Sequence, residues 1–340
     1  MKKYFISAML SALLFLTGCS AESSPEPVQG IFFAMDTMMD FTIYGESGLI
    51  DQSESLIASL ESLVSVTDTG SELYAINQTG SGTLTGKASS LMEQALEICR
   101  RTDGALDLSI YPIVRAWGFT TGSYQVPDEA EIQALLPLVD YRKIQYDAAT
   151  GTVTVTLPEG MEIDLGSVAK GYAGQLAAQM LREHGVQSAL LNLGGNVQTV
   201  GTKPDGSPWQ IGIKDPQGED AMMVLSVEDQ AVVTSGGYER YFEQDGQTYW
   251  HIMDPSTGHP ADSGLISVTI VGDEGVVCDG LSTALFVMGL EKAADLWAQS
   301  GDFEAVFVTA SGEVYITEGL RDHFALTERY ADTPVSVIER

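Results

Sequence analysis

The sequence predicts an α+β fold, in which helices flank an antiparallel-rich mixed sheet within a single compact unit. Strand-like and helix-like stretches are mixed along the chain without the strict strand–helix–strand alternation of parallel sheets. Of the 340 residues, 44% are hydrophobic, which is enough to bury a proper core. Because neither a linker nor an internal repeat divides the chain after about Ile31, we expect one domain over 31–330 and a C-terminal tail over 331–340.

The amino terminus has the features of a secretion signal, which lies outside the expected fold. Two lysines precede an apolar run, Ile6 to Leu16, that is too short to stay in a bilayer as a spanning helix. The run leads to Leu16-Thr17-Gly18-Cys19, which resembles the lipobox of bacterial lipoproteins. We therefore expect removal of 1–18, lipid on Cys19, and a tether over 19–30 that holds an extracytoplasmic protein on the cell membrane. A plain secretory signal or an uncleaved anchor is the alternative.

The charge of the chain disfavours two kinds of partner. With a formal net charge of −30, the protein is unsuited to nucleic acid and to electrostatic adhesion on anionic lipid headgroups. An anionic ligand would need local positive charge or a metal ion to be held. The cysteines of the domain, Cys99 and Cys278, have no zinc or redox spacing. Their pairing stays open, and two buried free thiols are the favoured interpretation.

The domain should begin with a strand followed by three helices. Phe32 to Gly45 shows apolar alternation near its end, which is typical of a strand. Leu49 to Val66 carries leucine and isoleucine at helical spacing, so one face should pack on a sheet. Ser71, or Thr69 before it, is suited to cap a short helix. Ser89 to Arg101 is amphipathic, and its two final arginines suit the carboxyl end of a helix.

The middle of the chain mixes a short helix, a hairpin and a strand-to-helix turn. Asp128 to Leu136 predicts the helix, and Lys143 to Leu157 predicts a hairpin that turns near Asp147 to Gly151. A β-type run from Gly151 to Ile163 then leads into a helical run from Ala173 to His184.

The rest of the domain is rich in strands and contains one strongly apolar helix, Asp279 to Gly289, extended by Glu291 to Gln299. Ser188 to Asn196 should be a buried strand that ends in a Gly-Gly turn, and Tyr249 to Gly258 a strand with its turn. The other expected strands are Trp209 to Lys214, Met222 to Val227, Ala231 to Thr234, Ile266 to Val271, Ala305 to Thr309 and Glu313 to Thr317.

The stretch from Asp164 to Gly174 is a candidate anion site. A strand-to-helix turn collects free backbone N–H groups and the positive end of a helix dipole, where a phosphate or carboxylate can bind. Gly166 and Gly171 allow close backbone approach, Ser167 offers an oxygen, and Lys170 adds a positive charge. Taken alone, the stretch also fits an ordinary helix start with Ser167 as its cap.

Two further positions carry groups suited to catalysis. Asp279 and Thr283 lie four residues apart, so on a helix both face one side with the hard oxygen ligands that Mg²⁺ accepts. The alternative is an Asp279 N-cap with Thr283 bonded back to the helix. His251, just before Met253 to Gly258, could take a proton from a hydroxyl nucleophile, or it could be a packed strand residue.

Together these stretches resemble one family closely, the ApbE-type flavin transferases, which are FAD:protein FMN transferases. Ten pieces match in family order and cover nearly all of Ile31 to Thr317. They are Met35-Asp36-Thr37, Gly70 to Asn77, Asp103-Gly104-Ala105-Leu106-Asp107, Trp117-Gly118-Phe119, Asp164 to Gly174, Asn192 to Asn196, Trp209 to Pro216, Thr234 to Arg240, His251 to Gly258 and Asp279 to Gly289. The chain departs from the family pattern at Asp36, where Gly is usual, and at Gly237, where Asp or Ser is commoner.

The resemblance implies a reaction and a set of site residues. FAD is split at its pyrophosphate, FMN is esterified to a Thr or Ser hydroxyl of a partner protein, and AMP leaves. Mg²⁺ would be held by Ser167, through its backbone carbonyl, together with Asp279 and Thr283. His251 and Asp279 would be catalytic, with His251 as the base. The residues expected to contact FAD are Met35, Thr67, Ala105, Leu106, Asp107, Asp164, Lys170 and His251.

Three alternatives remain open from the sequence. The same scaffold could hydrolyse FAD to FMN and AMP, with water in place of the acceptor hydroxyl, or it could carry FAD unchanged. More distantly, the chain could be a lipid-anchored solute-binding protein without catalysis. The occurrence of Lys170, His251, Asp279 and Thr283 together argues against the last alternative, because ligand capture alone does not require them.

Overall fold

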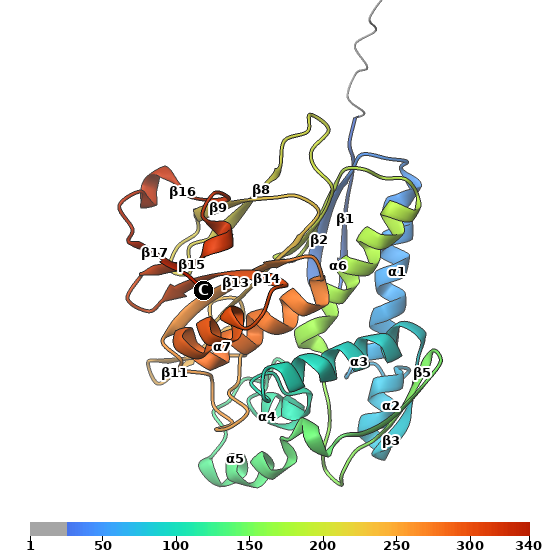
Figure 1. Ribbon diagram of the computed structural model, residues 1–340. Helices are drawn as coiled ribbons and strands as arrows, with labels where there is room; N and C mark the ends of the chain where they lie inside the picture. Colours follow the sequence, from blue (N-terminus) through green and yellow to red (C-terminus); the bar gives the residue numbers. More distant parts are fainter. Residues whose placement is uncertain (1–25) are drawn as a thin grey trace, which may run out of the picture.

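A nine-stranded sheet forms the centre of the computed structural model, which describes residues 26–340 (Figure 1). All neighbouring strands are antiparallel except the last pair, which is parallel. The expected antiparallel-rich mixed sheet is therefore confirmed. In spatial order its strands are β1 (Val28–Ala34), β2 (Thr37–Ile43), β6 (Ala189–Leu193), β7 (Asn196–Val200), β10 (Ala231–Gly236), β13 (Leu265–Gly272), β14 (Phe303–Thr309), β15 (Val314–Thr317) and β17 (Val335–Ile338).

Helices and a smaller sheet bury apolar side chains against the nine-stranded sheet. The largest core cluster joins the sheet to several helices, which include α1 (Gly48–Val64), α3 (Gly86–Arg101), α6 (Gly166–Glu183) and α7 (Gly275–Ala298). A second cluster joins it to a three-stranded sheet of β16 (Phe324–Leu326), β9 (Ala221–Val227) and β8 (Trp209–Lys214). In Figure 1 the orange α7 lies beside the lower end of the light-green α6.

The remaining elements lie mostly below these two helices in Figure 1. A third sheet contains β3 (Ser81–Thr85), β5 (Thr152–Thr156) and β4 (Gln145–Ala149), next to α2 (Glu72–Thr79). A third apolar cluster joins the hairpin of β11 (Tyr241–Gln244) and β12 (Gln247–Trp250) to α4 (Tyr111–Ala116) and α5 (Glu129–Leu135). Single-turn 3₁₀ helices occupy Leu108–Ile110, Leu136–Leu138, Tyr141–Lys143, Glu318–Leu320 and Glu328–Tyr330.

The first expected strand is in fact a hairpin. Phe32 to Gly45 is divided between β1 and β2 by a turn at Met35 and Asp36, whose φ angles are 49° and 58°. A side chain with a Cβ seldom adopts this left-handed conformation, and Asp is among the residues that tolerate it best. A polar residue between two apolar runs was therefore the signal for the turn.

Both functional helices begin earlier than the sequence predicted. β5 ends at Thr156 and α6 starts at Gly166, so Ser167 and Lys170 lie inside the first two turns of a helix that was expected from Ala173. Leu165 occupies the N-cap position of α6, so Ser167 is not its cap. Similarly, α7 starts at Gly275, which excludes Asp279 as an N-cap. The expected cap of α2 is confirmed, because the Ser71 hydroxyl accepts from the backbone N–H of Leu73 at 3.2 Å.

Strands were missed at both ends of the domain and after the Gly-Gly turn. β1 begins at Val28, within the expected tether, and β17 lies in the expected tail and extends the sheet. β7 was not predicted because three of its five residues are polar, and all three are buried. Cys99 and Cys278 are free and buried, as expected. Cys19 lies outside the described residues, and no helix within 26–340 is long and apolar enough to cross a bilayer.

Candidate functional site at the crossing of α6 and α7

The two stretches expected to form the metal site meet where α6 and α7 cross. Oδ2 of Asp279, on α7, accepts the backbone N–H of Gly171, on α6, at 2.8 Å. By helical spacing this N–H is the partner of the Ser167 carbonyl four residues earlier. Because the Gly171 N–H also donates to Asp279, the Ser167 carbonyl oxygen keeps a lone pair available beside that carboxylate. Thr283, one turn beyond Asp279, adds a hydroxyl on the same face.

The Asp279 carboxyl is almost fully buried, and burial raises its pKa. The positive charge of Lys170 and the N–H of Gly171 oppose that effect and favour the ionised form. A buried carboxylate needs such compensation, and a bound cation would add more of it. Within 26–340, no group of three or more His, Cys, Asp and Glu side chains is placed to hold a metal. The oxygens at the helix crossing form a different kind of site, with one carboxylate (Asp279), one hydroxyl (Thr283) and one backbone carbonyl (Ser167). These hard oxygen ligands fit Mg²⁺.

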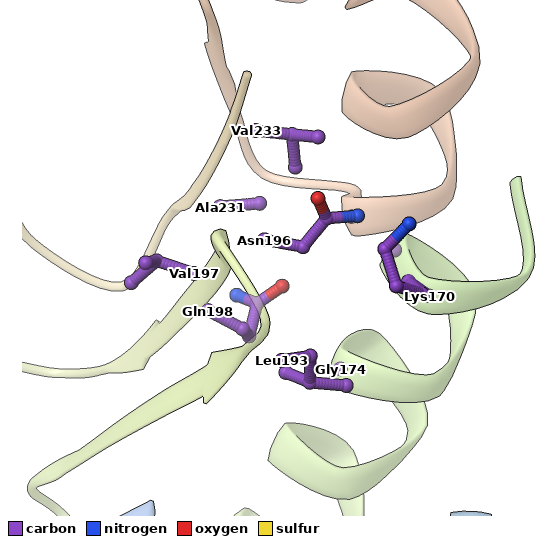
Figure 2. Close-up of a pocket in the computed structure, with 10 residues that line it drawn as sticks. Lys170, Gly174, Leu193, Asn196, Val197, Gln198, Ala231 and Val233 are labelled. Carbon is purple, nitrogen blue, oxygen red and sulfur yellow. The ribbon is translucent and has the colours of Figure 1, made fainter. Parts of the chain in front are cut away.

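Figure 2 shows the packing around Lys170 and Asn196, whose side chains reach toward the same space beside the first turn of α7. The gap lined by these side chains has no room for a water molecule. Nδ2 of Asn196 is buried, and its amide is among the groups that oppose the effect of burial on the pKa of Asp279. The Asn196 amide therefore lies beside the Asp279 carboxylate and favours its ionised form. The sequence placed Asn196 in a polar turn and gave it no role.

His251 follows β12 and is held by the backbone of Arg240. Its backbone N–H donates to the Arg240 carbonyl at 3.1 Å, and Nδ1 lies 3.2 Å from the same oxygen. Burial, together with the charges of Arg240 and Lys170, lowers the pKa of His251 to about 4. The ring is therefore neutral at pH 7, with its proton on Nδ1 and the lone pair of Nε2 available.

Arg240 is a residue that sequence reasoning missed, although it ends one of the ten matching pieces. Its guanidinium Nη2 donates to the Phe119 carbonyl at 2.7 Å, which ties the β11–β12 hairpin to the loop after α4. Its charge also acts on Asp164, whose pKa is raised by burial and held back by the Gly166 N–H and by Arg240. A cation in so acidic a chain was a usable signal, but Phe119 and Asp164, on which its guanidinium acts, are more than 70 residues away in sequence.

Asp164 and Asp107 are joined through the backbone. Oδ1 of Asp164 accepts the N–H of Gly166 at 2.9 Å, and the Asp164 N–H donates to the Leu108 carbonyl at 2.9 Å. The Asp107 carboxylate accepts from Ser109 N and Oγ at 2.9 and 2.6 Å and from Tyr141 N at 2.9 Å. Burial raises the pKa of Asp107 despite these donors. In this structure Asp107 therefore fixes the loop that leads to Asp164.

The other expected flavin contacts lie around this centre at different depths. Ala105 lines a cavity of about 530 Å³ between the Asp103 turn, the Asp254 turn and the second half of α7, a volume typical of small-molecule sites. Leu106, next to it, is buried in the core.

Met35 and Thr67 are less closely tied to the centre. Met35 is in the β1–β2 turn. Thr37, which begins β2, packs so tightly on Gly194 that a Cβ on Gly194 would overlap the Thr37 hydroxyl. Thr67 is exposed after α1, and its hydroxyl bonds to Ser65 at 3.3 Å rather than to another candidate residue.

The geometry defines a class of α+β protein in which a helix crossing presents a carboxylate, a hydroxyl and a lysine beside a neutral histidine. The model of the ApbE family matches residues 35–307, and the chain belongs to this family. A curated FAD:protein FMN transferase from Klebsiella pneumoniae is 35% identical over 285 residues, which cover 82% of this chain and 88% of the relative.

Solved structures agree with this assignment. The ApbE protein of Thermotoga maritima matches with a TM-score of 0.81 and 31% identity, over 88% of this chain and 99% of that one. The flavin transferase ApbE of Vibrio cholerae matches with a TM-score of 0.78 and 26% identity, over the same shares of the two chains. The fold expected from the resemblance is thus confirmed.

Proposed function

We propose that this protein is an FAD:protein FMN transferase. It cleaves FAD at the pyrophosphate, transfers FMN to a Thr or Ser hydroxyl of an acceptor protein, and releases AMP. The observation that carries the proposal is the 2.8 Å contact between Asp279 and Gly171, because it unites the Lys170 helix start with the Asp279–Thr283 face. The names of the curated relatives support the same activity.

Local positive groups explain how so acidic a chain would hold a diphosphate. The chain has a formal net charge of −30, so the overall field repels the ligand. Lys170 and the amino-terminal turns of α6 lie together at the helix crossing. Donors fixed there also stabilise negative charge that develops on the departing AMP phosphate.

Mg²⁺ fits the oxygen set at the crossing. The Ser167 carbonyl, the Asp279 carboxylate and the Thr283 hydroxyl would hold the ion, and the buried Asp279 carboxylate supplies the negative charge that favours it. When bound, Mg²⁺ neutralises charge on the phosphate oxygens that it contacts. Asp279 would thereby serve catalysis as a ligand.

His251 is suited to accept the proton of the acceptor hydroxyl. Because its Nδ1–H is directed to the Arg240 carbonyl, the free lone pair is on Nε2. Its lowered pKa makes it a weaker base than an ordinary histidine, but it keeps the ring neutral and ready at physiological pH. The rest of FAD would contact Met35, Thr67, Ala105, Leu106 and Asp164. Asp107 would support the loop that leads to Asp164.

The test is to incubate the full chain with FAD, Mg²⁺ and a candidate acceptor protein, and then to follow acceptor mass and nucleotide products. We expect an acceptor adduct with the mass of FMN, one AMP per adduct, and no reaction in EDTA. Free FMN without an adduct would identify a hydrolase, and intact bound FAD would identify a carrier. Either result would refute transfer to that acceptor.

We also propose that the mature protein is a lipoprotein anchored to the cell membrane through Cys19. The support is the lipobox-like Leu16-Thr17-Gly18-Cys19 after a short apolar run. In cells, the wild-type protein should fractionate with membranes and carry lipid on its amino-terminal peptide. A Cys19→Ala variant that still carries lipid and remains membrane-bound after cleavage would refute the proposal.

A further inference from the structure

We propose that Ser235 is a positioning residue for Thr283: a directed chain of hydroxyl groups turns the Thr283 lone pairs toward the metal position. This inference rests on the proposed metal site. Ser235 is near the end of β10, on the sheet, whereas Thr283 and its neighbour Ser282 are on α7. The Ser235 Oγ lies 2.8 Å from Ser282 Oγ and 3.3 Å from Thr283 Oγ1.

The direction of the chain follows from counting protons. Each hydroxyl has one proton to donate and two lone pairs to accept with. Ser282, which is fully buried, donates its proton to the Asp279 carbonyl at 2.8 Å, since a carbonyl can only accept. The 2.8 Å contact between Ser282 and Ser235 therefore uses the proton of Ser235.

With its own proton engaged, Ser235 can only accept from Thr283. The order is Thr283 to Ser235, Ser235 to Ser282, and Ser282 to the Asp279 carbonyl. This arrangement fixes the Thr283 proton on the sheet side, so its lone pairs remain for a cation on the side of the Asp279 carboxylate. The hydrogen bonds also strengthen one another, because a hydroxyl that donates its proton becomes a better acceptor for the hydroxyl before it in the chain.

The chain also prevents a competing conformation of Thr283. A threonine inside a helix commonly donates to the carbonyl four residues earlier, which here is Asp279. Ser282 already occupies that carbonyl, and Ser235 offers Thr283 another acceptor. Removing the Ser235 hydroxyl leaves Thr283 free to rotate, which weakens the metal site without removing a ligand.

The test compares Mg²⁺ binding by the full-length wild-type protein, Ser235→Ala and Thr234→Val, using Mg²⁺ alone in isothermal titration and in thermal unfolding. Loss of a residue that orients a metal ligand typically weakens metal binding about 10–100-fold, so we expect a loss of about tenfold or more for Ser235→Ala. Thr234→Val is the matched control, because its hydroxyl pairs with Thr269 at 2.9 Å, outside the chain. Ser235→Thr restores a hydroxyl and should recover the affinity.

Three results would overturn the inference: an Mg²⁺ affinity of Ser235→Ala within twofold of wild type, an equal loss in Thr234→Val, or no Mg²⁺ binding by the wild-type protein. FMN transfer is measured in parallel, so that the two proposals fail separately. If the affinity pattern is found but no acceptor is flavinylated, the hydroxyl chain stands and the transferase proposal fails. If transfer is normal and Ser235→Ala binds Mg²⁺ as wild type does, only the hydroxyl chain is wrong.

Discussion

Gly171 of α6 and Gly275 of α7 face each other so closely that neither position has room for a side chain. A Cβ on Gly171 would overlap the Gly275 carbonyl oxygen and come within 2.6 Å of the Asp279 Cβ, and a Cβ on Gly275 would overlap the Gly171 carbonyl. Both opposing groups are backbone, so neither can move aside alone. The missing side chains are what allow the Gly171 N–H to reach the Asp279 carboxylate.

Gly171→Ala should therefore separate the two helices. We expect a loss of about 1–3 kcal/mol in the free energy of unfolding, as for other overpacked sites, and a larger relative loss of Mg²⁺-dependent transfer. Denaturant unfolding and FMN transfer measure the two effects. Gly48→Ala is the control, because a Cβ there meets nothing within 4 Å. If Gly171→Ala were as stable and active as this control, the close crossing would have no importance for the site.

Asp279→Ala should fold normally and lose metal-dependent turnover. Burial raises the pKa of Asp279, so removing the carboxylate relieves a desolvation cost that partly offsets the lost bond to Gly171. We expect a similar unfolding temperature without metal and no stabilisation by Mg²⁺. Asp147→Ala, on an exposed strand, is the control for loss of charge. Unchanged turnover in Asp279→Ala would refute the metal assignment.

His251→Ala should retain FAD binding and slow transfer by roughly 10²-fold or more, the usual effect of losing a general base. FAD affinity is measured from flavin fluorescence, and transfer from acceptor mass in single-turnover experiments. A loss confined to FAD affinity would instead make His251 a binding residue. A rate near that of wild type would exclude it from the mechanism.

The stability of the protein should depend on pH through His251. Its pKa is about 4 in the folded protein and about 6.5 when unfolded, so the unfolded state binds more protons between these values. The contribution is present above pH 6.5 and is lost progressively as the pH falls from 6.5 toward 4. His251→Gln should flatten this part of the curve in urea unfolding. Equal slopes in the variant and the wild-type protein would show that His251 is not buried in its neutral form.

The two buried thiols should resist alkylation in the folded protein. Burial raises the pKa of Cys99 to about 12, and burial with the nearby Asp279 raises that of Cys278 further. Since the thiolate is the reactive form, iodoacetamide at pH 8 should label both peptides only after denaturation. Peptide mapping by mass spectrometry measures this. Rapid labelling of either peptide under native conditions would contradict the buried environment.

Much of the fold could be predicted from local patterns. The helix over α1 and the hairpin of β4 and β5 follow from apolar spacing and turn residues, and the Ser71 cap follows from its side chain. These features depend on residues near one another in the sequence. Prediction failed where tertiary contacts overrode local preference, as in β7, whose polar side chains are buried, and in β17, which is stabilised by pairing with β15.

The candidate site also combines features set by the local sequence with features set by tertiary contacts. The sequence by itself determined the groups available for chemistry, namely Lys170, His251, Asp279 and Thr283, because residue type and helical spacing fix charge, proton affinity and face. Only the tertiary structure decided that Asp279 meets Gly171 from 108 residues away, that Arg240 holds His251 neutral, and that Ser235 contacts Thr283. Such contacts depend on how closely two helices and a sheet can approach, and that distance is set by packing across the whole core.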